Sequence, residues 1–404
     1  MPIPHISAAN YNEDKVPKYN LIDPLKMRDG SPVTSTEDWE RKRRPEILNL
    51  FREHVYGHSK KKPSGLKFKV IQNDSTALGG IAIRREVLIT FARNEETPEA
   101  SLLIYLPKGN NGPFPTFLTT NFYGNHTISS DPGISITRSW VRNEKKWGIK
   151  NNKAGEQSRG VRQSRWAVEK ILNRGYALAT IYYGDIDPDF DDNFSNGIHK
   201  LYGKPKPNDW GSIATWAWGL SRCLDYLEND NDINAKKVAV MGHSRLGKTA
   251  LWAGAEDERF ALVISNNSGC GGAALSRREF GETVKRINTS FPHWFCDNFT
   301  KFNDRVNELP VDQHLLISLA APRPVYIASA TEDKWADPKG EFLSAYHASP
   351  VYELFNLKGL TSPNQPKSDH SVGHNIGYHI RTGKHDVTEF DWEQYINFAD
   401  RHLK

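Results

Sequence analysis

The chain has 404 residues, of which 38% are hydrophobic and 25% are charged, and its formal net charge at pH 7 is +5. This balance is ordinary for a globular protein and excludes both a disordered chain and a membrane bundle. No run approaches the ~18 consecutive apolar residues of a membrane span, so we expect no membrane partner. The two signs of charge are interspersed, which argues against nucleic acid as a partner.

The cysteines and the first residues bear on the compartment. Three cysteines in a chain of this length exclude a disulfide scaffold. The opening residues, MPIPHISAANYNEDK, have neither the basic nor the apolar region of a secretory signal. These residues therefore leave two alternatives open: a secreted or periplasmic protein whose signal is absent from this sequence, or a cytoplasmic protein.

The first part of the chain divides into an arm, a helix and a group of strands. Residues 1–35 are rich in Pro, Asn and Asp and lack periodicity, so we expect an extended N-terminal arm, followed by a single domain over residues 36–404. Apolar residues spaced by three and four predict an amphipathic helix from Thr36 that ends at Gly57. Three runs then predict successive antiparallel strands, at residues 67–72, 81–92 and 100–107.

Beyond this point, strands and helices alternate. The expected strands cover residues 114–122, 176–189, 236–242, 260–269 and 323–333. The expected helices cover residues 164–175, 208–229, 244–255 and 390–404, with Asp209 or Ser212 as the possible N-cap of the second. This alternation predicts an α/β fold, a mostly parallel sheet with antiparallel N-terminal strands and helices on both faces. Residues 273–320 interrupt it as an excursion of helices and loops over one end of the sheet.

The most informative segment is KKVAVMGHSRLGKTALWAGA, in which a buried strand meets a helix with Gly242, Ser244 and Gly247 at the junction. In α/β-hydrolases the nucleophilic serine lies on such a sharp strand-to-helix turn. The second glycine comes three residues after the serine, which departs from the common G-x-S-x-G spacing. We interpret Ser244 as a nucleophile; the alternative is a helix N-cap serine whose hydroxyl bonds a backbone amide.

Two cations, Arg245 and Lys248, lie in the first turn of the same helix, where an exposed positive charge costs about 0.3–1 kcal/mol. They predict that an anion, permanent or transient, binds at this end of the helix. Arg245 is a candidate for holding an oxyanion, and Lys248, on the same helix face as the serine, is a candidate for contacting substrate oxygens. The alternative is that both only pair with acids such as Glu256 or Asp257.

The acid and the base of a hydrolase triad follow the serine in chain order. The last expected strand ends in Glu332 and Asp333, which are both candidates for the acid. His385 precedes the closing helix, where this fold places the base. Three further histidines stay open as alternatives: His370, His374 and His379. Neither the histidines nor the cysteines show the spacing of a metal site, so we expect no metal and no cofactor.

The heptapeptide GHSRLGK resembles the G-x-S-R-x-G-K signature of glucuronoyl esterases, carbohydrate esterase family 15. The resemblance, to bacterial members, covers roughly residues 36–404 and includes NFYGNHT, SGCGGAALSRREFGETV, FPHWFCDNF, LPVDQHLLISLAAPRPV, EDKWADPKGEF and GYHIRTGKHD. It implies an α/β-hydrolase fold and cleavage, without a metal, of the ester between glucuronic or 4-O-methylglucuronic acid of xylan and lignin alcohols.

The resemblance also implies residue roles. For the reaction it implies Ser244 as nucleophile, His385 as general base and Arg245 as oxyanion donor. It assigns Lys248, Glu282 and Trp335 to the uronate ring, because a lysine and a carboxylate bind hydroxyls and an indole forms an apolar wall. The alternatives are a helix-surface carboxylate for Glu282 and a core aromatic for Trp335.

One position departs from the family pattern. Many members carry a glutamate just after the strand that follows the nucleophile helix, and this chain has Asn267 there. Because an asparagine cannot stabilise an imidazolium by charge, the acid must come from the later strand end. Asp333 matches a position used by other members, with Glu332 in reserve; the alternative is that both only cap the following turn.

Taken as a whole, the sequence indicates a serine carboxylic-ester hydrolase that acts through an acyl-enzyme on a carbohydrate ester, as a monomer. One alternative is a broad-specificity acetyl or feruloyl esterase on the same fold, against which Lys248 and Glu282 argue because they suit a hydroxylated acyl group. The other is an inactive, esterase-like carbohydrate-binding protein, against which the intact Ser244, His385 and Asp333 argue.

Overall fold

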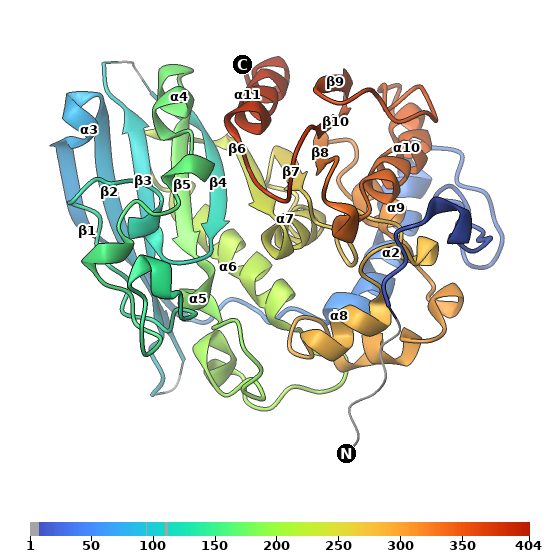
Figure 1. Cartoon of the computed structure of the whole chain (residues 1–404), viewed down its shortest axis with the longest axis horizontal. Coiled ribbons are helices and arrows are strands. Elements are labelled where there is room, and N and C mark those ends of the chain that lie inside the picture. Colours follow the sequence, from blue (N-terminus) through green and yellow to red (C-terminus); the bar gives the residue numbers. More distant parts are fainter. Residues whose placement is uncertain (1–7, 94, 110–111) are drawn as a thin grey trace.

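A computed structural model describes residues 8–93, 95–109 and 112–404 of the chain. Its centre is a ten-stranded sheet with the strand order β1-β2-β3-β5-β4-β6-β7-β8-β10-β9, which runs from left to right in Figure 1. The strands are β1 (Gly65–Thr76), β2 (Ala82–Ala92), β3 (Glu99–Pro107), β4 (Phe114–Asn121), β5 (Ala177–Tyr182), β6 (Ile233–His243), β7 (Leu262–Asn266), β8 (Val325–Ala330), β9 (His370–Gly373) and β10 (Ile376–Arg381).

Helices connect most of these strands. They are α1 (Thr36–Asp38), α2 (Arg44–Phe51), α3 (Ala77–Gly80), α4 (Val168–Asn173), α5 (Tyr183–Ile186), α6 (Ser212–Leu227), α7 (Arg245–Glu256), α8 (Val284–Ser290), α9 (Gln313–Ser318), α10 (Pro338–Leu354) and α11 (Glu389–Leu403). The helix expected from Thr36 is confirmed: π-helical turns continue α1 and α2, and Gly57 ends the helix with a φ of 85°.

The pairing of the strands confirms the expected sheet. Neighbouring strands from β1 to β5 are antiparallel, and those from β5 through β4, β6, β7 and β8 to β10 are parallel. β9, which the sequence did not predict, closes the far edge antiparallel to β10. Because parallel strands end at one edge of a sheet, the loops after β6, β7, β8 and β10 are placed close together.

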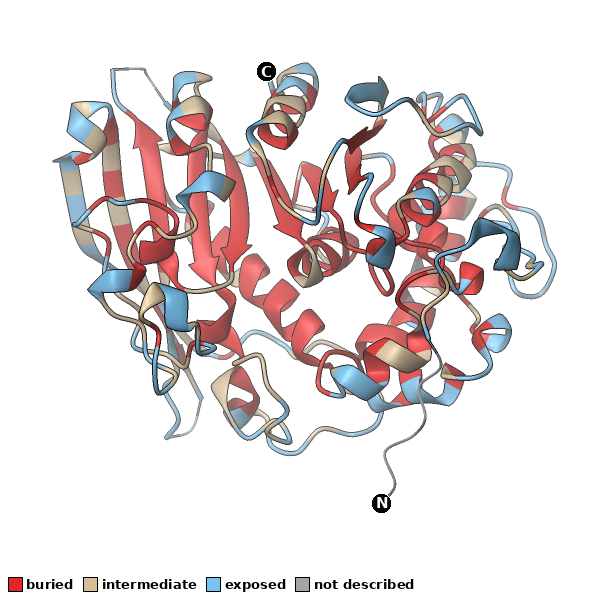
Figure 2. Cartoon of the chain, in the orientation of Figure 1, coloured by how far each residue is buried: buried red, intermediate tan, exposed pale blue. Residues whose placement is uncertain are grey.

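Helices cover both faces of the sheet, as expected. Side chains alternate between the faces of a strand, and Val238 and Val240 of β6 belong to one hydrophobic cluster with residues of α6 and α7. Ala239 and Met241 of the same strand belong to a second cluster with residues of α4 and α11. Figure 2 shows the inner strands buried throughout, whereas the edge strand β1 is partly exposed.

Three details differ from the sequence prediction. The helix at 208–229 is capped by neither Asp209 nor Ser212: it begins at Ser212 after Gly211, and Asp209 instead pairs with Lys60 at 2.5 Å. The strand expected at 176–189 ends at Tyr182. Its parallel neighbour β4 ends at Asn121, directly opposite Tyr182, so the residues after Tyr182 have no β4 residues to pair with. The helix expected over residues 164–175 is shorter and begins at Val168.

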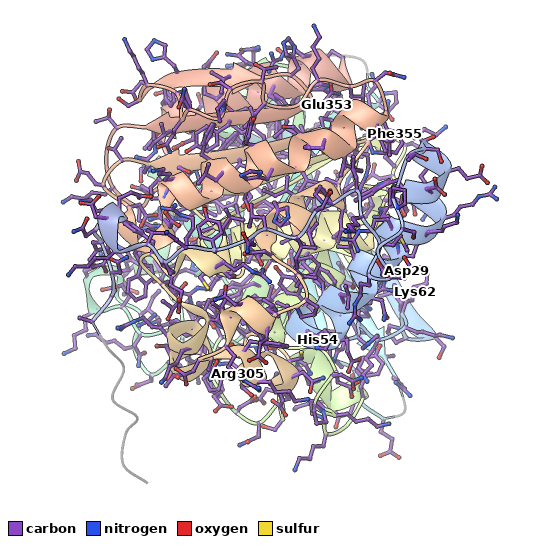
Figure 3. The ribbon with its side chains drawn as sticks, turned by 90° about the vertical axis from the view of Figure 1, so that its right-hand side faces the viewer. Asp29, His54, Lys62, Arg305, Glu353 and Phe355 are labelled. Atoms are coloured by element: carbon purple, nitrogen blue, oxygen red, sulfur yellow. The ribbon has the colours of Figure 1, made fainter. Side chains whose placement is uncertain are left out.

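The excursion expected over residues 273–320 is confirmed by α8, α9 and short 3₁₀ turns. The N-terminal arm contacts this part of the molecule: Glu13 pairs with Arg278 at 2.8 Å, and the Ile22 carbonyl oxygen accepts a hydrogen bond from His314 at 2.7 Å. In Figure 3 the right-hand side of Figure 1 faces the viewer. This view shows Asp29 of the arm, and it shows Glu353 and Phe355 at the end of α10. Residues 1–7 of the expected arm lie outside the described residues.

The three cysteines, at 223, 270 and 296, are buried free thiols. In the described part of the chain, no helix combines the length and the apolar character that crossing a bilayer requires.

A buried acid beneath the strand ends makes the stability of the fold depend on pH. The carboxyl of Glu341, in α10, accepts hydrogen bonds from the Gly269 amide at 3.0 Å and the Ser329 hydroxyl at 2.6 Å. Burial raises its pKa from 4.5 to about 8. Because the folded state then holds the proton more tightly than the unfolded chain, stability falls between these pH values by up to about 1.4 kcal/mol per pH unit.

Glu341→Gln keeps the shape of the side chain and removes the ionisation. We expect this variant to have a higher Tm than the wild type at pH 8 and to lose most of that advantage at pH 5, in thermal unfolding followed by circular dichroism. Glu353→Gln, at the exposed end of the same helix, is the control. A difference between Glu341→Gln and the wild type that is equal at both pH values would contradict this account.

Candidate active site

Ser244 lies on the turn between β6 and α7, with a φ of 58° and a ψ of −129°. A Cβ at Gly242 would come within 1.8 Å of the Leu246 carbonyl oxygen, so only glycine allows the strand and the helix to pass this closely. The Ser244 hydroxyl makes no cap hydrogen bond, so the interpretation as an N-cap serine is wrong. The residue is partly exposed, and its strained backbone is that of a nucleophile turn.

His385 and Asp333 contact each other: His385 Nδ1 lies 2.6 Å from Asp333 Oδ2. Asn267 donates from Nδ2 to the same oxygen at 2.8 Å, a contact that the sequence did not predict. Burial alone would raise the pKa of Asp333, but the hydrogen bond and charge of His385, together with Asn267, hold this pKa below its usual range. The neighbouring Glu332 is exposed, so the structure brings Asp333 and not Glu332 to the histidine.

A second histidine, His243, packs against the ring of His385. His243, the residue before Ser244, places its ring centroid 4.5 Å from that of His385. Burial, and then the charge of His385, lowers the pKa of His243 well below its usual value, so its ring is neutral. Its Nδ1 lies 2.6 Å from Asn266 Oδ1, which fixes the plane of the ring. His385 is thereby placed beside the turn between β6 and α7.

Arg381, the last residue of β10, forms hydrogen bonds to the backbone of the loop that carries His385. Arg381 Nη2 donates at 2.7 Å to two carbonyl oxygens, those of the residues on either side of His385. Asp391, in α11, accepts from Arg381 Nε at 2.8 Å and is fully buried. The ion pair anchors Arg381, whose hydrogen bonds in turn hold the backbone on both sides of His385.

The three alternative histidines do not contact Asp333 within the described residues. His379 is buried and contacts Asp391 at 2.9 Å, and His370 is exposed on β9. The carbonyl of His374 accepts a hydrogen bond from His402 at 3.0 Å. Over residues 8–93, 95–109 and 112–404, no three His, Cys, Asp or Glu side chains gather as metal ligands would.

The guanidinium of Arg245 is paired with Asp189, which the sequence analysis did not single out. Burial would raise the pKa of Asp189, but the charge of Arg245 and hydrogen bonds from His293 and Trp294 hold it well below its usual value. The guanidinium also lies 4.6 Å from the centroid of the Trp294 ring. Arg245 Nε is buried without a hydrogen-bond partner among the described residues, so the group retains a donor.

The two acids proposed as alternative partners of the cations are engaged elsewhere. Glu256 pairs with Arg52 at 2.7 Å, and Asp257 pairs with Arg259 at 2.7 Å. The alternative interpretation therefore named the wrong acids, but each cation does lie beside an acid: Arg245 pairs with Asp189, and Lys248 lies near Glu282.

Lys248, Glu282 and Trp335 come together on one side of the turn. Lys248 Nζ donates to the Ser268 carbonyl at 2.5 Å and lies 3.8 Å from Glu282 Oε2, with both side chains 5% exposed. Burial raises the pKa of Glu282, and the charge of Lys248 opposes this rise. The Glu282 amide donates to the Trp335 carbonyl at 3.0 Å, and Trp335 is 39% exposed. Glu282 is thus not a surface carboxylate, and Trp335 is not a core aromatic.

The fold and the geometry of this site define the class of protein to which the chain belongs. A serine on a strained turn after a parallel strand, a histidine held by a buried carboxylate and an adjacent guanidinium are the parts of a serine hydrolase with the α/β-hydrolase fold.

Comparison with known proteins narrows the class. A family model described as "Glucuronyl esterase, fungi" matches residues 167–356. Carbohydrate esterase MZ0003, from an unknown prokaryotic organism, is 57% identical over 98% of this chain and 92% of its own length. Two solved structures are similar over their whole length. One is a promiscuous CE15 esterase from the marine bacterial metagenome, with 56% identity over 98% of this chain, 100% of that chain and a TM-score of 0.92. The other is a glucuronoyl esterase from Solibacter usitatus, with 49% identity over 97% of this chain, 100% of that chain and a TM-score of 0.92.

The chain therefore belongs to the glucuronoyl esterases, carbohydrate esterase family 15, and is a carboxylic ester hydrolase. This confirms the resemblance noted for GHSRLGK, and the comparisons give no support to a protein that only binds carbohydrate.

The Arg245–Asp189 pair leads to a testable expectation. Asp189→Asn removes the charge that fixes the guanidinium, so we expect kcat for ester hydrolysis to fall by about tenfold or more, with the fold retained in near-UV circular dichroism. Asp191→Asn, an exposed position of the same loop, is the matched control and should keep wild-type kcat. A folded Asp189→Asn enzyme with the kcat of the wild type would contradict this expectation, because it would show that the charge of Asp189 is not needed to position the Arg245 guanidinium.

Proposed function

We propose that this chain hydrolyses esters of glucuronic or 4-O-methylglucuronic acid, of the kind that joins xylan to lignin alcohols, through an acyl-enzyme. The observation that carries the proposal is the arrangement of Lys248, Glu282 and Trp335 beside Ser244. A buried ammonium and a buried carboxylate offer donors and acceptors to ring hydroxyls, and a half-exposed indole offers an apolar wall. A simple acetyl group would use none of these three.

In the first half of the reaction, His385 takes the proton of Ser244 as the hydroxyl oxygen attacks the C6 carbonyl of the uronate. Asp333, at 2.6 Å from Nδ1, keeps the proton on that nitrogen and leaves Nε2 to act as the base. The backbone N–H of Arg245 is the first of α7 and has no intrahelical acceptor, so together with the guanidinium it stabilises the oxyanion.

In the second half, His385 donates the proton to the departing alcohol, and the ester of Ser244 and the uronate carbonyl is left. His385 then deprotonates a water molecule, which attacks this acyl-enzyme. The bond between the Ser244 oxygen and C6 breaks, His385 returns the proton to that oxygen, and the free uronate is released. The carboxylate of Asp333 stabilises the imidazolium that forms in each half. Arg245 stays charged throughout, because its partner Asp189 is ionised.

The substrate class also bears on location and organisation. A polymer-bound ester lies outside the cell, so we propose that the protein is secreted or periplasmic. We further propose that residues 36–404 form one catalytic domain that acts as a monomer, because every group assigned to the reaction comes from this chain.

A substrate panel tests the proposal. We expect the wild type to hydrolyse methyl and benzyl glucuronate with a higher kcat/KM than p-nitrophenyl acetate, because only the uronates use Lys248 and Glu282. Ser244→Ala and His385→Ala should each lose more than about 10³-fold in kcat. A higher kcat/KM for the acetate would instead indicate a broad-specificity esterase.

The assignment of the acid has its own test. We expect Asp333→Asn to lower kcat about 10³–10⁴-fold, because an amide neither fixes the tautomer of His385 nor stabilises its cation. Glu332→Gln, at the adjacent and exposed position, should leave kcat within about twofold of the wild type. Loss of activity in Glu332→Gln with activity kept in Asp333→Asn would reverse the assignment.

A further inference from the structure

The first turn of α11 carries a buried carboxylate, Asp391, that the proposed mechanism does not use. Helix α11 packs against β7, β8 and β10 (Figure 1). Asp391 is fully buried and contacts two side chains of β10: Arg381 Nε donates to its Oδ2 at 2.8 Å, and His379 Nε2 lies 2.9 Å from its Oδ1. Burial alone would raise the pKa of Asp391, but its contacts with His379 and the charge of Arg381 hold this pKa below its usual range. Asp391 is therefore an anion at neutral pH, and a buried anion with satisfied hydrogen bonds fixes the donors around it.

One branch of hydrogen bonds runs from Asp391 to the loop of His385. Arg381 Nη2 donates at 2.7 Å to the carbonyls of the two residues that flank His385. Asp391 also holds the far end of this loop, because its Oδ2 accepts from the Thr388 amide at 2.6 Å and from the Thr388 hydroxyl at 2.8 Å. The backbone on both sides of the catalytic base is therefore tied to one carboxylate.

A second branch runs from Asp391 to the turn of Ser244. Asn266, the last residue of β7, donates from Nδ2 to Asp391 Oδ1 at 3.4 Å and to the hydroxyl of Tyr395, one turn further along α11, at 2.6 Å. Its Oδ1 lies 2.6 Å from His243 Nδ1, and its backbone carbonyl accepts from the Ser244 amide at 2.8 Å. Asn266 thus contacts both the ring that packs against the catalytic base and the backbone that carries the nucleophile.

A third contact of Asp391 leads away from these groups. His379 Nδ1 lies 2.9 Å from the Tyr326 hydroxyl, which in turn lies 2.8 Å from Ser371 Oγ on the exposed edge strand β9. The same buried network therefore contains two branches that reach the catalytic groups and one that ends at the edge of the sheet. This third branch provides an internal comparison.

The separation of base and nucleophile is what the first two branches control. Ser244 follows β6 and His385 follows β10, so neither residue fixes the other through the chain. His385 can take the proton of Ser244 only within hydrogen-bond reach, and a misplacement of about 1 Å can lower a rate about 10²-fold. A single rigid group that contacts both parts of the site restricts such movement.

We propose that Asp391 is a positioning residue for ester hydrolysis, which holds the loop of His385 through Arg381 and the turn of Ser244 through Asn266. It contacts no reacting atom. The inference deepens the proposed function and rests on its assignment of base and nucleophile, but it does not depend on the acyl group. The effect of Asp391 should therefore be the same for a uronate ester and for a simple acetate.

Asp391→Asn keeps the shape of the side chain and removes its charge. We expect kcat to fall about 10–10²-fold, by the same factor for methyl glucuronate and p-nitrophenyl acetate, with KM within about twofold of the wild type. The reason is that the base is displaced from the nucleophile while the acyl-binding groups stay in place. Tyr326→Phe, which removes the hydroxyl of the third branch, is the matched control and should keep the kcat of the wild type. Near-UV circular dichroism checks the fold of each variant.

A second variant tests the same contact from the other side. Arg381→Lys keeps the positive charge beside Asp391, but an ammonium lacks the planar set of donors that reaches the carboxylate and the two loop carbonyls together. We expect Arg381→Lys to lower kcat as well. An enzyme with both Arg381→Lys and Asp391→Asn should be little slower than Asp391→Asn alone, because the two residues act through one contact.

Several outcomes would overturn the positioning role of Asp391. They are a folded Asp391→Asn enzyme with the kcat of the wild type, a loss confined to KM, losses that multiply in full in the double variant, or an equal loss in Tyr326→Phe. If Asp391→Asn does not fold, Arg381→Lys decides in the same way: a folded variant with the kcat of the wild type overturns the role. A wild type that hydrolyses the acetate but not methyl glucuronate would overturn the proposed function and leave the role of Asp391 standing.

Discussion

The left-handed backbone of Ser244 is the constraint on which the rest of the site depends. A non-glycine residue in this region costs about 1–3 kcal/mol and persists only where the surroundings impose it. Here the Ser244 amide donates to the Asn266 carbonyl at 2.8 Å, its own carbonyl accepts from Gly247 at 2.8 Å, and the close passage at Gly242 admits no side chain. The turn therefore keeps the hydroxyl out of the helix cap and at the edge of the sheet where His385 lies.

Around this turn, buried charges occur in opposite pairs. Arg245 pairs with Asp189, and Lys248 lies near Glu282. The buried carboxylate of Asp333 is held by hydrogen bonds with Asn267 and His385. A buried charge is tolerated when such a partner offsets its desolvation, and removing one member leaves the other uncompensated. The pairs fix the positions of the polar groups before substrate binds, so little reorganisation is needed as negative charge develops on the carbonyl oxygen.

The sequence predicted best what is local. The turn at Ser244 was predictable because its glycines and serine are close together in the sequence. The alternation of strands and helices was predictable because it follows from short-range hydrophobic patterns. Asp189 was not, because it meets Arg245 from 56 residues away and nothing near it in sequence marks the contact. Asn267 likewise reaches Asp333 across 66 residues. Helix α10 was missed because Pro350 interrupts its pattern, and β9 because it is four residues long and largely exposed.

The central claim is that one hydroxyl, that of Ser244, is made nucleophilic by its turn and by the His385–Asp333 pair. Reaction with a fluorophosphonate, followed by peptide mass spectrometry, measures this directly, because the reagent traps a serine activated by a neighbouring base. The account predicts a single phosphonylated residue, Ser244, and no labelling in the Ser244→Ala variant. Labelling at another residue, or a wild-type protein that stays unlabelled while it hydrolyses esters, would contradict it.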